Sequence, residues 1–588
     1  MQIRRVTVSN FRGIGSSDWR LPENRFVCLV GPGDSTKTTL LDVVSLVLSP
    51  RWNVSFTDAD FYNCQVGEPI VLRAVIGDLP PWLLRDDAHG FELSGLRPDG
   101  ELVHDPENGT EPCLVIQLKV TSSLEPAWTV VRPGFADDGV PIGAKARENL
   151  GLFRVDERIE AHLRWGRSSA LTRLTANKSG ADAAVTSAHR SARSVIFDSP
   201  PELLTAAAAE VQTAAQAIGG TSFTRLQPGL DPAGSSTTSA LLLHDEDIPL
   251  TGYGLGTRRL ISLAIQERAF NEGAILLIDE VEHGLEPHRL HHLLRYLKKR
   301  TITGTDQVLV TTHSAPAVEG LQAQDISVVR SKDGITTVQQ VPGDLYDVQG
   351  TLRAAPSTVL ASRVVVCEGK TEMGVVRSFL LHWDTQRIGQ GKAPHAALGV
   401  CQSNGQGSTD APKRARILRE LGYPVLLMID NDDPASDSGI AEAEGKGAEV
   451  VRWQDGHALE DEVADALSPA GLAALVELAA EIKGEDSVLN GIGARLPGKP
   501  NLSGLGPASW MSTTCTIEQV RQAIGATAKS KKLSGNKVKE EKTAWFKQEE
   551  SGELLGDLLI RHWSEIAGTQ LGQGLKDLYT FAYGEKLP

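Results

Sequence analysis

The stretch AILLIDEVEHGLEP, residues 274–287, decides how the rest of the sequence is interpreted. Its apolar residues Ile275 to Ile278 run directly into Asp279 and Glu280, which is typical of a strand buried on both faces of a parallel sheet. Ligands of open α/β sheets bind at the carboxyl ends of such strands. Asp279 is therefore a candidate for holding Mg²⁺ and Glu280 for orienting or deprotonating a water. A strand that merely ends in an acidic turn is the alternative, and motifs elsewhere argue against it.

Composition describes a globular protein of more than one domain, because the 588 residues are 41% hydrophobic and 23% charged. No apolar run is long enough for a bilayer, and the N-terminal MQIRRVTVSNFRG resembles a strand more than a signal peptide. The six scattered cysteines lack a CxxC pair, which argues against a zinc site and suits the cytoplasm. With a formal net charge of −15, binding to DNA would need a local basic patch.

A phosphate-binding loop is expected near the N-terminus. An apolar strand at Arg25–Val30 leads into GPGDSTKTTLL, and a helical pattern continues through Leu48. This is the context of a P-loop, in which Lys37 would reach the β- and γ-oxygens of ATP and Thr38 would ligate Mg²⁺. The expected nucleotide-binding residues are Gly31, Gly33, Asp34, Ser35, Thr36, Lys37, Thr38 and Thr39.

The loop departs from the usual GxxxxGK[ST] pattern at one position, where Thr36 replaces a glycine. A β-branched residue suits neither a positive φ nor the close approach of a phosphate. We therefore expect ATP to bind and to be hydrolysed slowly.

Between the P-loop and Asp279 the sequence changes character. Strand-like segments occur at 70–76, 114–120 and 128–131, whereas residues 151–224 are rich in Ala, Arg and Ser and include a strong helix candidate at 202–218. We interpret 151–224 as a helical insert that splits an ATPase domain into residues 1–150 and 225–350. Its expected use is protein contact, with a plain surface excursion as the alternative.

Two further segments complete the expected ATPase. In DIPLTGYGLGTRRLISLAIQ, a glycine-containing turn with Thr251, Gly254 and Gly256 precedes a helix and would present N–H groups to an anion. It resembles the signature segment of ABC-type ATPases, which contacts the nucleotide held by a second subunit. The strand in QVLVTTHSAP ends at His313, the position of the switch histidine that senses the γ-phosphate in such ATPases. The order of these motifs predicts an ABC-type P-loop ATPase.

The C-terminal half places carboxylates after two more apolar segments. Residues 331–356 are expected to be a domain boundary; after them, Val364–Cys367 runs into EGKTE and Pro424–Ile429 runs into DND. Strand ends spaced in this way can lie side by side in one parallel sheet. Converging carboxylates need divalent cations, so the pattern predicts a two-metal site that activates water, with two unrelated acidic turns as the alternative. The carboxylates concerned are Glu368, Glu372, Asp430 and Asp432.

ATPase motifs followed by EGKTE and DND resemble the overcoming-lysogenization-defect (OLD) family, in which an ABC-type ATPase is fused to a C-terminal Toprim domain. The resemblance covers nearly the whole chain. It implies an α/β fold: the ABC-type ATPase with a helical dimerisation insert, then a Toprim nuclease domain over residues 358–588, a Rossmann-like parallel sheet with helical additions. The implied function is an ATP-regulated, metal-dependent DNA endonuclease that uses Mg²⁺ or Mn²⁺. Family members include the nuclease subunit of Gabija-type anti-phage defence, which works beside a UvrD-like helicase.

The resemblance also assigns roles and partners. It makes the four carboxylates metal ligands, and the ALEDEV segment adds Glu460 and Asp461. In the family a catalytic lysine follows the core strands, which makes Lys547 the first candidate and Lys542 the second. The lysine-rich segment 529–542 could supply the basic patch, with an ordinary flexible loop as the alternative. Expected partners are DNA, a second copy in a homodimer or higher even oligomer, and a UvrD-like helicase.

Other functions fit parts of the sequence. The main alternative is a DNA-repair scaffold of the RecF or SMC kind, in which ATP drives clamping and the C-terminal domain is catalytically silent. A topoisomerase would need a nucleophilic tyrosine on a recognisable DNA-gate domain, and a bacterial-type primase usually carries a zinc-binding module. Neither feature is present in the sequence.

Overall fold

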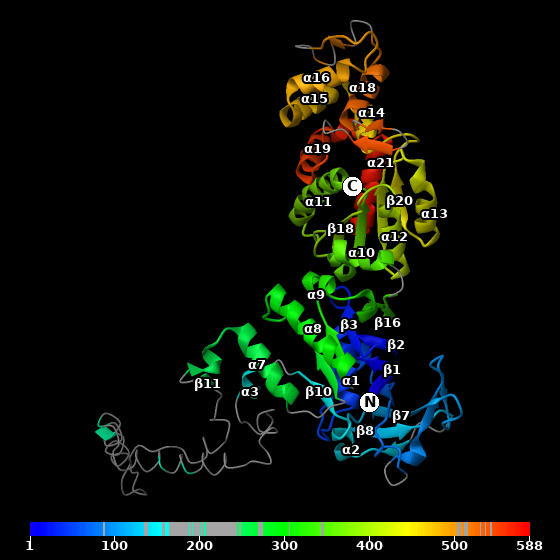
Figure 1. Cartoon of the computed structure of the whole chain (residues 1–588), viewed down its shortest axis with the longest axis vertical. Helices are drawn as coiled ribbons and strands as arrows, with labels where there is room; N and C mark the ends of the chain where they lie inside the picture. Colours follow the sequence, from blue (N-terminus) through cyan, green and yellow to red (C-terminus); the bar gives the residue numbers. More distant parts are fainter. Residues whose placement is uncertain are drawn as a thin grey trace. The chain divides into compact units, whose positions relative to one another are not determined.

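The computed structural model describes residues 1–85, 89–134, 139–155, 159–163, 244–245, 248–268, 274–304, 306–342, 346–502, 506, 509–510, 515–529, 531–534, 537–540 and 544–587, together with a few single positions between 187 and 206. These residues group into two compact units (Figure 1). The first comprises Met1–Arg5, Leu41–Phe56 and Leu72–Val310, and the second comprises Val6–Leu40, Thr57–Val71 and Thr311–Pro588. Most of the expected insert at 151–224, including the helix at 202–218, lies outside the described residues.

In the first unit, three parallel strands carry the stretch that ends in Asp279. They are β10 (Leu152–Arg154), β13 (Ile275–Ile278) and β14 (Gln307–Thr311), and β13 lies in the middle. All four residues of β13 are buried, which confirms the prediction of a strand covered on both faces. Helix α7 (Leu255–Arg268) precedes β13 and helix α8 (Pro287–Thr303) follows it.

The strand-like segments before the insert are also strands. They are β4 (Ile70–Gly77), β7 (Glu111–Val120) and β8 (Pro126–Val131). Strands β7 and β8 pair as an antiparallel hairpin, with Ile116 opposite Val130. The predicted strands at 70–76, 114–120 and 128–131 are therefore confirmed.

In the second unit, the P-loop follows strand β3 (Phe26–Val30), and helix α1 (Lys37–Val47) begins at its lysine. Strand β3 pairs in parallel with β15 (Ile326–Lys332), which forms an antiparallel hairpin with β16 (Ile335–Gln340). The stretch 331–356, expected to be a domain boundary, lies inside this unit and contains β16 and helix α10 (Tyr346–Ala354).

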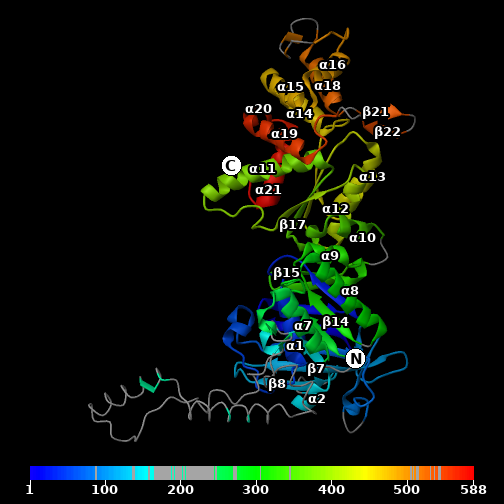
Figure 2. The same ribbon diagram turned by 60° about the vertical axis from the view of Figure 1, so that its left-hand side comes forward.

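The C-terminal part of the second unit is built on a four-stranded parallel sheet. Its order is β18 (Val400–Asn404), β17 (Arg363–Cys367), β19 (Val425–Ile429) and β20 (Glu449–Arg452). Helices α12 (Asp410–Glu420) and α13 (Asp437–Gly445) cover one face, and α11 (Lys370–Gly389) and α21 (Gln570–Tyr583) cover the other (Figures 1 and 2). The chain goes from β17 to one side and then returns to β19 on the other. The carboxyl ends of β17 and β19 therefore flank the crevice in which ligands of such sheets bind.

Helix α19 (Glu549–Arg561) lies directly against α11. A Cβ atom on Gly552 would lie 2.5 Å from the carbonyl oxygen of Thr371, and one on Gly374 would overlap the carbonyl oxygen of Glu549. The two helices therefore touch backbone to backbone near their N-terminal ends.

Beyond β20 the chain forms a cluster of helices (Figure 2). Its members are α14 (Leu459–Ala466), α15 (Pro469–Lys483), α16 (Glu485–Gly493) and α18 (Ile517–Lys529). This cluster and the parallel sheet share one apolar core. None of the helices that the structure describes has the length and apolar character needed to cross a bilayer.

Candidate active site

The P-loop is folded around its own lysine. The ammonium of Lys37 donates hydrogen bonds to the carbonyl oxygens of Gly31 at 3.1 Å and Pro32 at 2.7 Å, and to Oγ of Ser35 at 3.1 Å. Lys37 is only 4% exposed. A nucleotide phosphate that binds this ammonium must therefore replace contacts that the loop makes with itself.

Thr36 adopts the backbone conformation for which glycine is favoured. Its φ is +68°, in the left-handed region that costs an L-residue about 1–2 kcal/mol. Its hydroxyl lies 2.6 Å from the carbonyl oxygen of Ser35 and 3.0 Å from the hydroxyl of Thr336 on β16. The conflict predicted for a β-branched residue at this position is therefore present, and two hydrogen bonds offset part of its cost.

The carboxylates after β13 are held by arginines that the sequence analysis did not identify. The guanidinium of Arg154 contacts Asp42 and lies 3.6 Å from Oδ2 of Asp279. Arg259 donates to the carbonyl oxygens of Asp279 at 3.2 Å and Glu280 at 2.7 Å. Asp279 is buried, whereas Glu280 is exposed and has a φ of +44°. Nothing in the sequence singled out Arg154, because its partners are remote along the chain.

The segment predicted to be an ABC signature lies against the turn after β13. Thr251 lies in the short helix η5 (Leu250–Gly252), and Gly254 directly precedes α7. A Cβ atom on Gly256 would lie 2.6 Å from the carbonyl oxygen of Gly284, so this contact requires glycine. The first turn of α7 and the turn that carries Glu280 are thus packed together within the first unit.

His313 lies in the second unit, two residues after β14, and is exposed. The neighbouring Thr312 donates its backbone N–H to the carbonyl oxygen of Leu29 at 3.2 Å, so the segment before His313 runs beside the end of β3. This places His313 close to the strand from which the P-loop emerges.

The clearest convergence of predicted residues is at the ends of β17 and β19. Glu368 donates its backbone N–H to the carbonyl oxygen of Met428 at 2.9 Å, and its Oε2 accepts the backbone N–H of Asp430 at 2.9 Å. The two carboxylate clusters that lie far apart along the chain are therefore adjacent in space. They lie at the point where the strand order of the sheet reverses.

Glu372 occupies the first turn of α11 and is buried. Its Oε2 accepts the backbone N–H of Gly369 at 2.8 Å. Burial, and then the negative charges of Glu460 and Glu368, raise the pKa of Glu372 to about 7. Burial raises the pKa of Asp430 well above its usual value, and four carboxylates add to the shift: Glu372, Glu368, Glu460 and Asp432. These five acidic side chains therefore share one electrostatic environment.

Helix α14 brings Glu460 to the same place. Its start is fixed by the backbone N–H of Leu459, which donates to Oδ1 of Asp430 at 2.9 Å. Glu460 is 4% exposed, and its Oε1 is buried without a hydrogen-bond partner. A buried carboxylate oxygen in this state calls for a cation or an ordered water.

Asp461 is placed differently from the expectation that it joins the metal site. Its Oδ2 accepts the ammonium of Lys529 at 2.6 Å and the backbone N–H of Ala458 at 2.9 Å. Consecutive residues on a helix point about 100° apart, so when Glu460 faces the carboxylates, Asp461 faces α18. We therefore remove Asp461 from the candidate ligands.

Lys547 is tethered beside Glu372. The residues before it, Trp545 and Phe546, are each 1% exposed, and the hydroxyl of Thr371 donates to the carbonyl oxygen of Phe546. Lys547 itself is half-buried, and its positive charge acts to lower the pKa of Glu372. Lys542, the second candidate, lies outside the described residues.

The loop after β18 also contributes to this edge of the sheet. Gly407 donates its backbone N–H to the carbonyl oxygen of Glu368 at 2.9 Å, and the hydroxyl of Ser408 donates to Oδ2 of Asp433 at 2.7 Å. These contacts fix the loop to the ends of β17 and β19. The sequence analysis missed this loop, although its NGQGST composition is a turn signal.

The chemistry of this carboxylate cluster fits hard divalent cations. Its donors are all carboxylate oxygens, the ligands that Mg²⁺ and Mn²⁺ prefer, and one of them is the buried oxygen of Glu460 that lacks a partner. Within the part of the chain that the structure describes, however, no three His, Cys, Asp or Glu side chains already form a group that could hold a metal. The donors are neighbours, and a cation would have to draw them closer together.

Comparison with known families identifies the class of the N-terminal part. Residues 26–318 match the family described as "AAA domain, putative AbiEii toxin, Type IV TA system". Together with the motifs from Lys37 to His313, this match makes that part of the chain an ATP-binding P-loop ATPase domain of the ABC type. An ATPase domain of this class binds ATP, usually with Mg²⁺.

Two solved structures illustrate how distant the known relatives are. A crystal structure of an Smc head bound to the C-terminal winged-helix domain of ScpA has 14% sequence identity and a TM-score of 0.32, covering 57% of this chain and 97% of that one. An Smc head domain with an extended coiled coil, bound to the C-terminal domain of ScpA from Pyrococcus furiosus, has 12% identity and the same TM-score, covering 57% and 95%. At these TM-scores the likeness carries no argument about function. No curated protein matches this chain.

Proposed function

We propose that the chain is an ATP-regulated, metal-dependent DNA endonuclease of the OLD family, with residues 358–588 as its Toprim nuclease domain. The observation that carries the proposal is the convergence of buried carboxylates at the ends of β17 and β19, with Lys547 beside them. Carboxylates that raise one another's pKa destabilise a metal-free protein, so their assembly needs a function.

In this proposal the carboxylate cluster holds Mg²⁺ or Mn²⁺, and ions held there supply an activated water and stabilise the leaving oxygen. The ligands would be Glu368, Glu372, Asp430, Asp432 and Glu460. Lys547 would donate hydrogen bonds to the non-bridging oxygens of the scissile phosphate, where negative charge builds up. Carboxylates cannot make these hydrogen bonds because they lack donors.

The ATPase part would act as the regulator. We propose that Lys37 and Thr38 bind ATP with Mg²⁺, that Asp279 and Glu280 serve the metal and the attacking water, and that His313 senses the γ-phosphate. The segment from Thr251 to Gly256 would contact nucleotide held by a second copy, with residues 151–224 as a dimerisation insert. DNA would be the substrate, the lysine-rich hairpin β21–β22 (Lys531–Ser534 and Lys537–Glu540) would lie near it, and anti-phage defence or DNA repair would be the setting, with a UvrD-like helicase as a partner.

The second candidate is an ATP-dependent DNA-binding scaffold of the RecF or SMC kind without nuclease activity. The observation that favours it is that no described group of side chains is already arranged to hold a metal. A catalytically silent domain could retain acidic residues in such an arrangement.

A plasmid-nicking assay with Mg²⁺ or Mn²⁺ separates the two candidates, and two neighbouring residues provide a matched pair. Glu460→Gln removes a proposed ligand and is expected to slow nicking by orders of magnitude, because loss of a metal ligand removes several kcal/mol of transition-state stabilisation. Asp461→Asn changes the adjacent residue, which is paired with Lys529, and is expected to retain nicking. Equal nicking by wild type, Glu460→Gln and Asp430→Ala would exclude the nuclease and leave the scaffold.

A further inference from the structure

Exposed apolar side chains in the C-terminal part gather on one surface. Among the described residues after Tyr346, three large apolar side chains are exposed: Leu381 at 54%, Ile388 at 59% and Leu554 at 46%. Leu381 and Ile388 are seven residues apart on α11 and therefore share a helix face, and Leu554 lies on α19, which packs against α11. Apolar side chains concentrated in this way mark an interaction surface.

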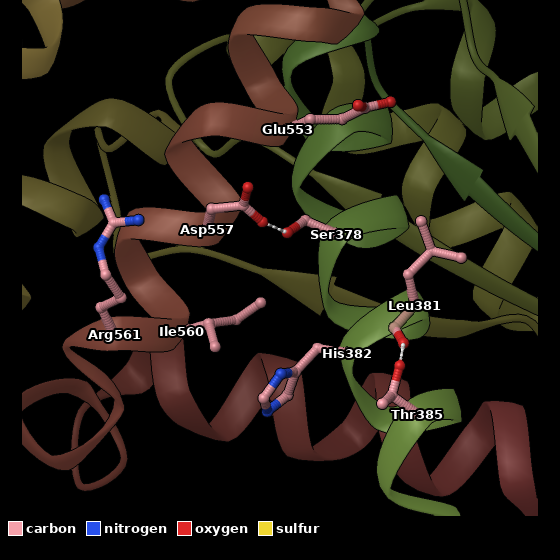
Figure 3. Close-up of a pocket in the computed structure, with 8 residues that line it drawn as sticks. All are labelled: Ser378, Leu381, His382, Thr385, Glu553, Asp557, Ile560 and Arg561. Atoms are coloured by element: carbon pink, nitrogen blue, oxygen red, sulfur yellow. Dashed lines mark hydrogen bonds between the residues drawn. The ribbon is translucent and has the colours of Figure 1, made fainter. Parts of the chain in front are cut away.

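The same surface is hollowed. A pocket between α11 and α19 is lined by Leu381 and His382 on one helix and by Asp557 and Ile560 on the other (Figure 3). A second pocket adjoins it and shares His382 and Ile560. The two helices touch where Gly374 and Gly552 meet, and larger side chains line the space further along. The result is a groove at the end of α11 remote from Glu372, so it is separate from the carboxylate cluster.

Charged residues along the groove are ordered. Glu553, Asp557 and Arg561 follow one another at intervals of four residues on α19, which places them on one helix face. Figure 3 shows Glu553 at one end of the pocket and Arg561 at the other. Glu553 lies 3.3 Å from Arg377, and Asp557 accepts the hydroxyl of Ser378, whereas Arg561 is exposed. One surface therefore carries an acidic end and a basic end.

This order of charges identifies the occupant. A two-fold axis across α19, between residues 557 and 561, would place Asp557 of each copy opposite Arg561 of the other. The same axis would bring Ile560 and the apolar side chains of α11 together at the centre. A two-fold interface requires this self-complementarity, because one patch must supply both partners of every contact.

We propose that the α11–α19 face is a two-fold interface between two copies of this chain. Two helices from each copy would form a four-helix bundle with an apolar centre and two Asp557–Arg561 ion pairs. This interface is distinct from the insert at 151–224, so together the two would give a higher even oligomer. The proposal does not depend on nuclease activity.

The test uses the full chain and measures its mass in solution by light scattering across a concentration series. Arg561→Glu places two acidic residues opposite each other in the paired state, and Asp557→Arg places two basic residues opposite each other. Each variant alone is expected to have half the mass of the wild type. A mixture of the two restores both ion pairs between unlike copies and is expected to recover the wild-type mass.

Two further variants keep the test decisive. Asp557→Arg also removes the hydrogen bond from Ser378, so Leu381→Asp is included as a disruption that leaves this bond in place. Arg495→Glu reverses an exposed charge on the distant helix α16 and is expected to retain the wild-type mass. The proposal is overturned if Arg561→Glu and Leu381→Asp have the mass of the wild type, or if the mixture of charge variants fails to recover it.

Discussion

Glu368 and Asp430 are joined by a hydrogen bond from the backbone N–H of Asp430 to Oε2 of Glu368, 2.9 Å long. A candidate metal ligand at the end of one strand thus orders the backbone of another ligand at the end of the next strand. The site and the fold share this side chain, so its substitution affects both.

This double role gives a prediction with two readouts. Glu368→Ala leaves the N–H of Asp430 without its acceptor and is expected to lower the free energy of unfolding by about 1–3 kcal/mol. Glu368→Gln keeps an amide oxygen at this position and is expected to unfold close to the wild type. Both variants are expected to lose metal-dependent nicking, since neither side chain is a carboxylate. Thermal unfolding and plasmid nicking measure the two effects, and nicking by Glu368→Gln at the wild-type rate would contradict the assignment.

Lys547 is predicted to act on the reaction and on the acidity of the site. Lys547→Ala is expected to slow single-turnover cleavage at saturating DNA with little loss of DNA affinity. Its charge acts to lower the pKa of Glu372, so its removal is expected to shift the pH profile of Mn²⁺ binding towards higher pH. Lys542→Ala serves as the comparison. If Lys547→Ala instead weakens DNA binding and flattens its salt dependence at an unchanged rate, Lys547 only contacts phosphates.

The raised pKa of Glu372 predicts how stability depends on pH. In the unfolded chain this carboxyl titrates near 4.5, and in the folded protein near 7, so between these values the folded state holds a proton that the unfolded state lacks. The resulting contribution is full below about pH 4.5 and is lost as the pH rises through 7. In a chelator, the wild type is expected to unfold at lower temperature at pH 8 than at pH 6, by on the order of 3 kcal/mol at most.

Glu372→Gln removes this titration and is expected to flatten the difference between pH 6 and pH 8. Mg²⁺ is expected to stabilise the wild type more at pH 8, where the carboxylates are charged, than at pH 6. A wild type that becomes more stable from pH 6 to pH 8 in chelator, with Glu372→Gln behaving identically, would show that the environment of Glu372 is not as described.

The strained backbone at Thr36 gives a prediction for nucleotide binding. Thr36→Gly relieves a positive φ and is expected to keep or raise the affinity for ATP, whereas Lys37→Ala is expected to weaken it. Thr336→Val removes the hydrogen bond to Thr36 without altering the glycine-like φ, so it separates the two effects. Calorimetry with ATP and Mg²⁺ makes the comparison. A lower affinity in Thr36→Gly than in Thr336→Val would mean that the threonine itself helps to bind ATP.

Glu280 is predicted to serve hydrolysis and not binding. Its side chain is exposed and lies 3.9 Å from His283, while Asp279 beside it is buried against Arg154. Glu280→Gln is expected to bind ATP as the wild type does and to release no phosphate above background. Phosphate release and ATP binding are measured on the same preparation. Loss of binding in Glu280→Gln, or hydrolysis at the wild-type rate, would assign the residue another role.

Sequence alone determined the strands and the ends that carry acidic residues. Runs such as Val364–Cys367 and Ile275–Ile278 are apolar without interruption, and only a strand covered on both faces buries every side chain of so short a run. Because a parallel sheet brings the carboxyl ends of its strands to one edge, the approach of Glu368 to Asp430 followed from the same pattern.

Only the tertiary structure decided which of the neighbouring polar residues belong to the carboxylate cluster. Glu460 and Asp461 are adjacent and chemically alike, yet one faces the carboxylates and the other pairs with Lys529, because the rotation of α14 is set by packing against α18 and β19. Lys547 is placed by the bond between Thr371 and Phe546, and Arg154 joins Asp42 to Asp279. These contacts link residues remote along the chain, and no local periodicity encodes them.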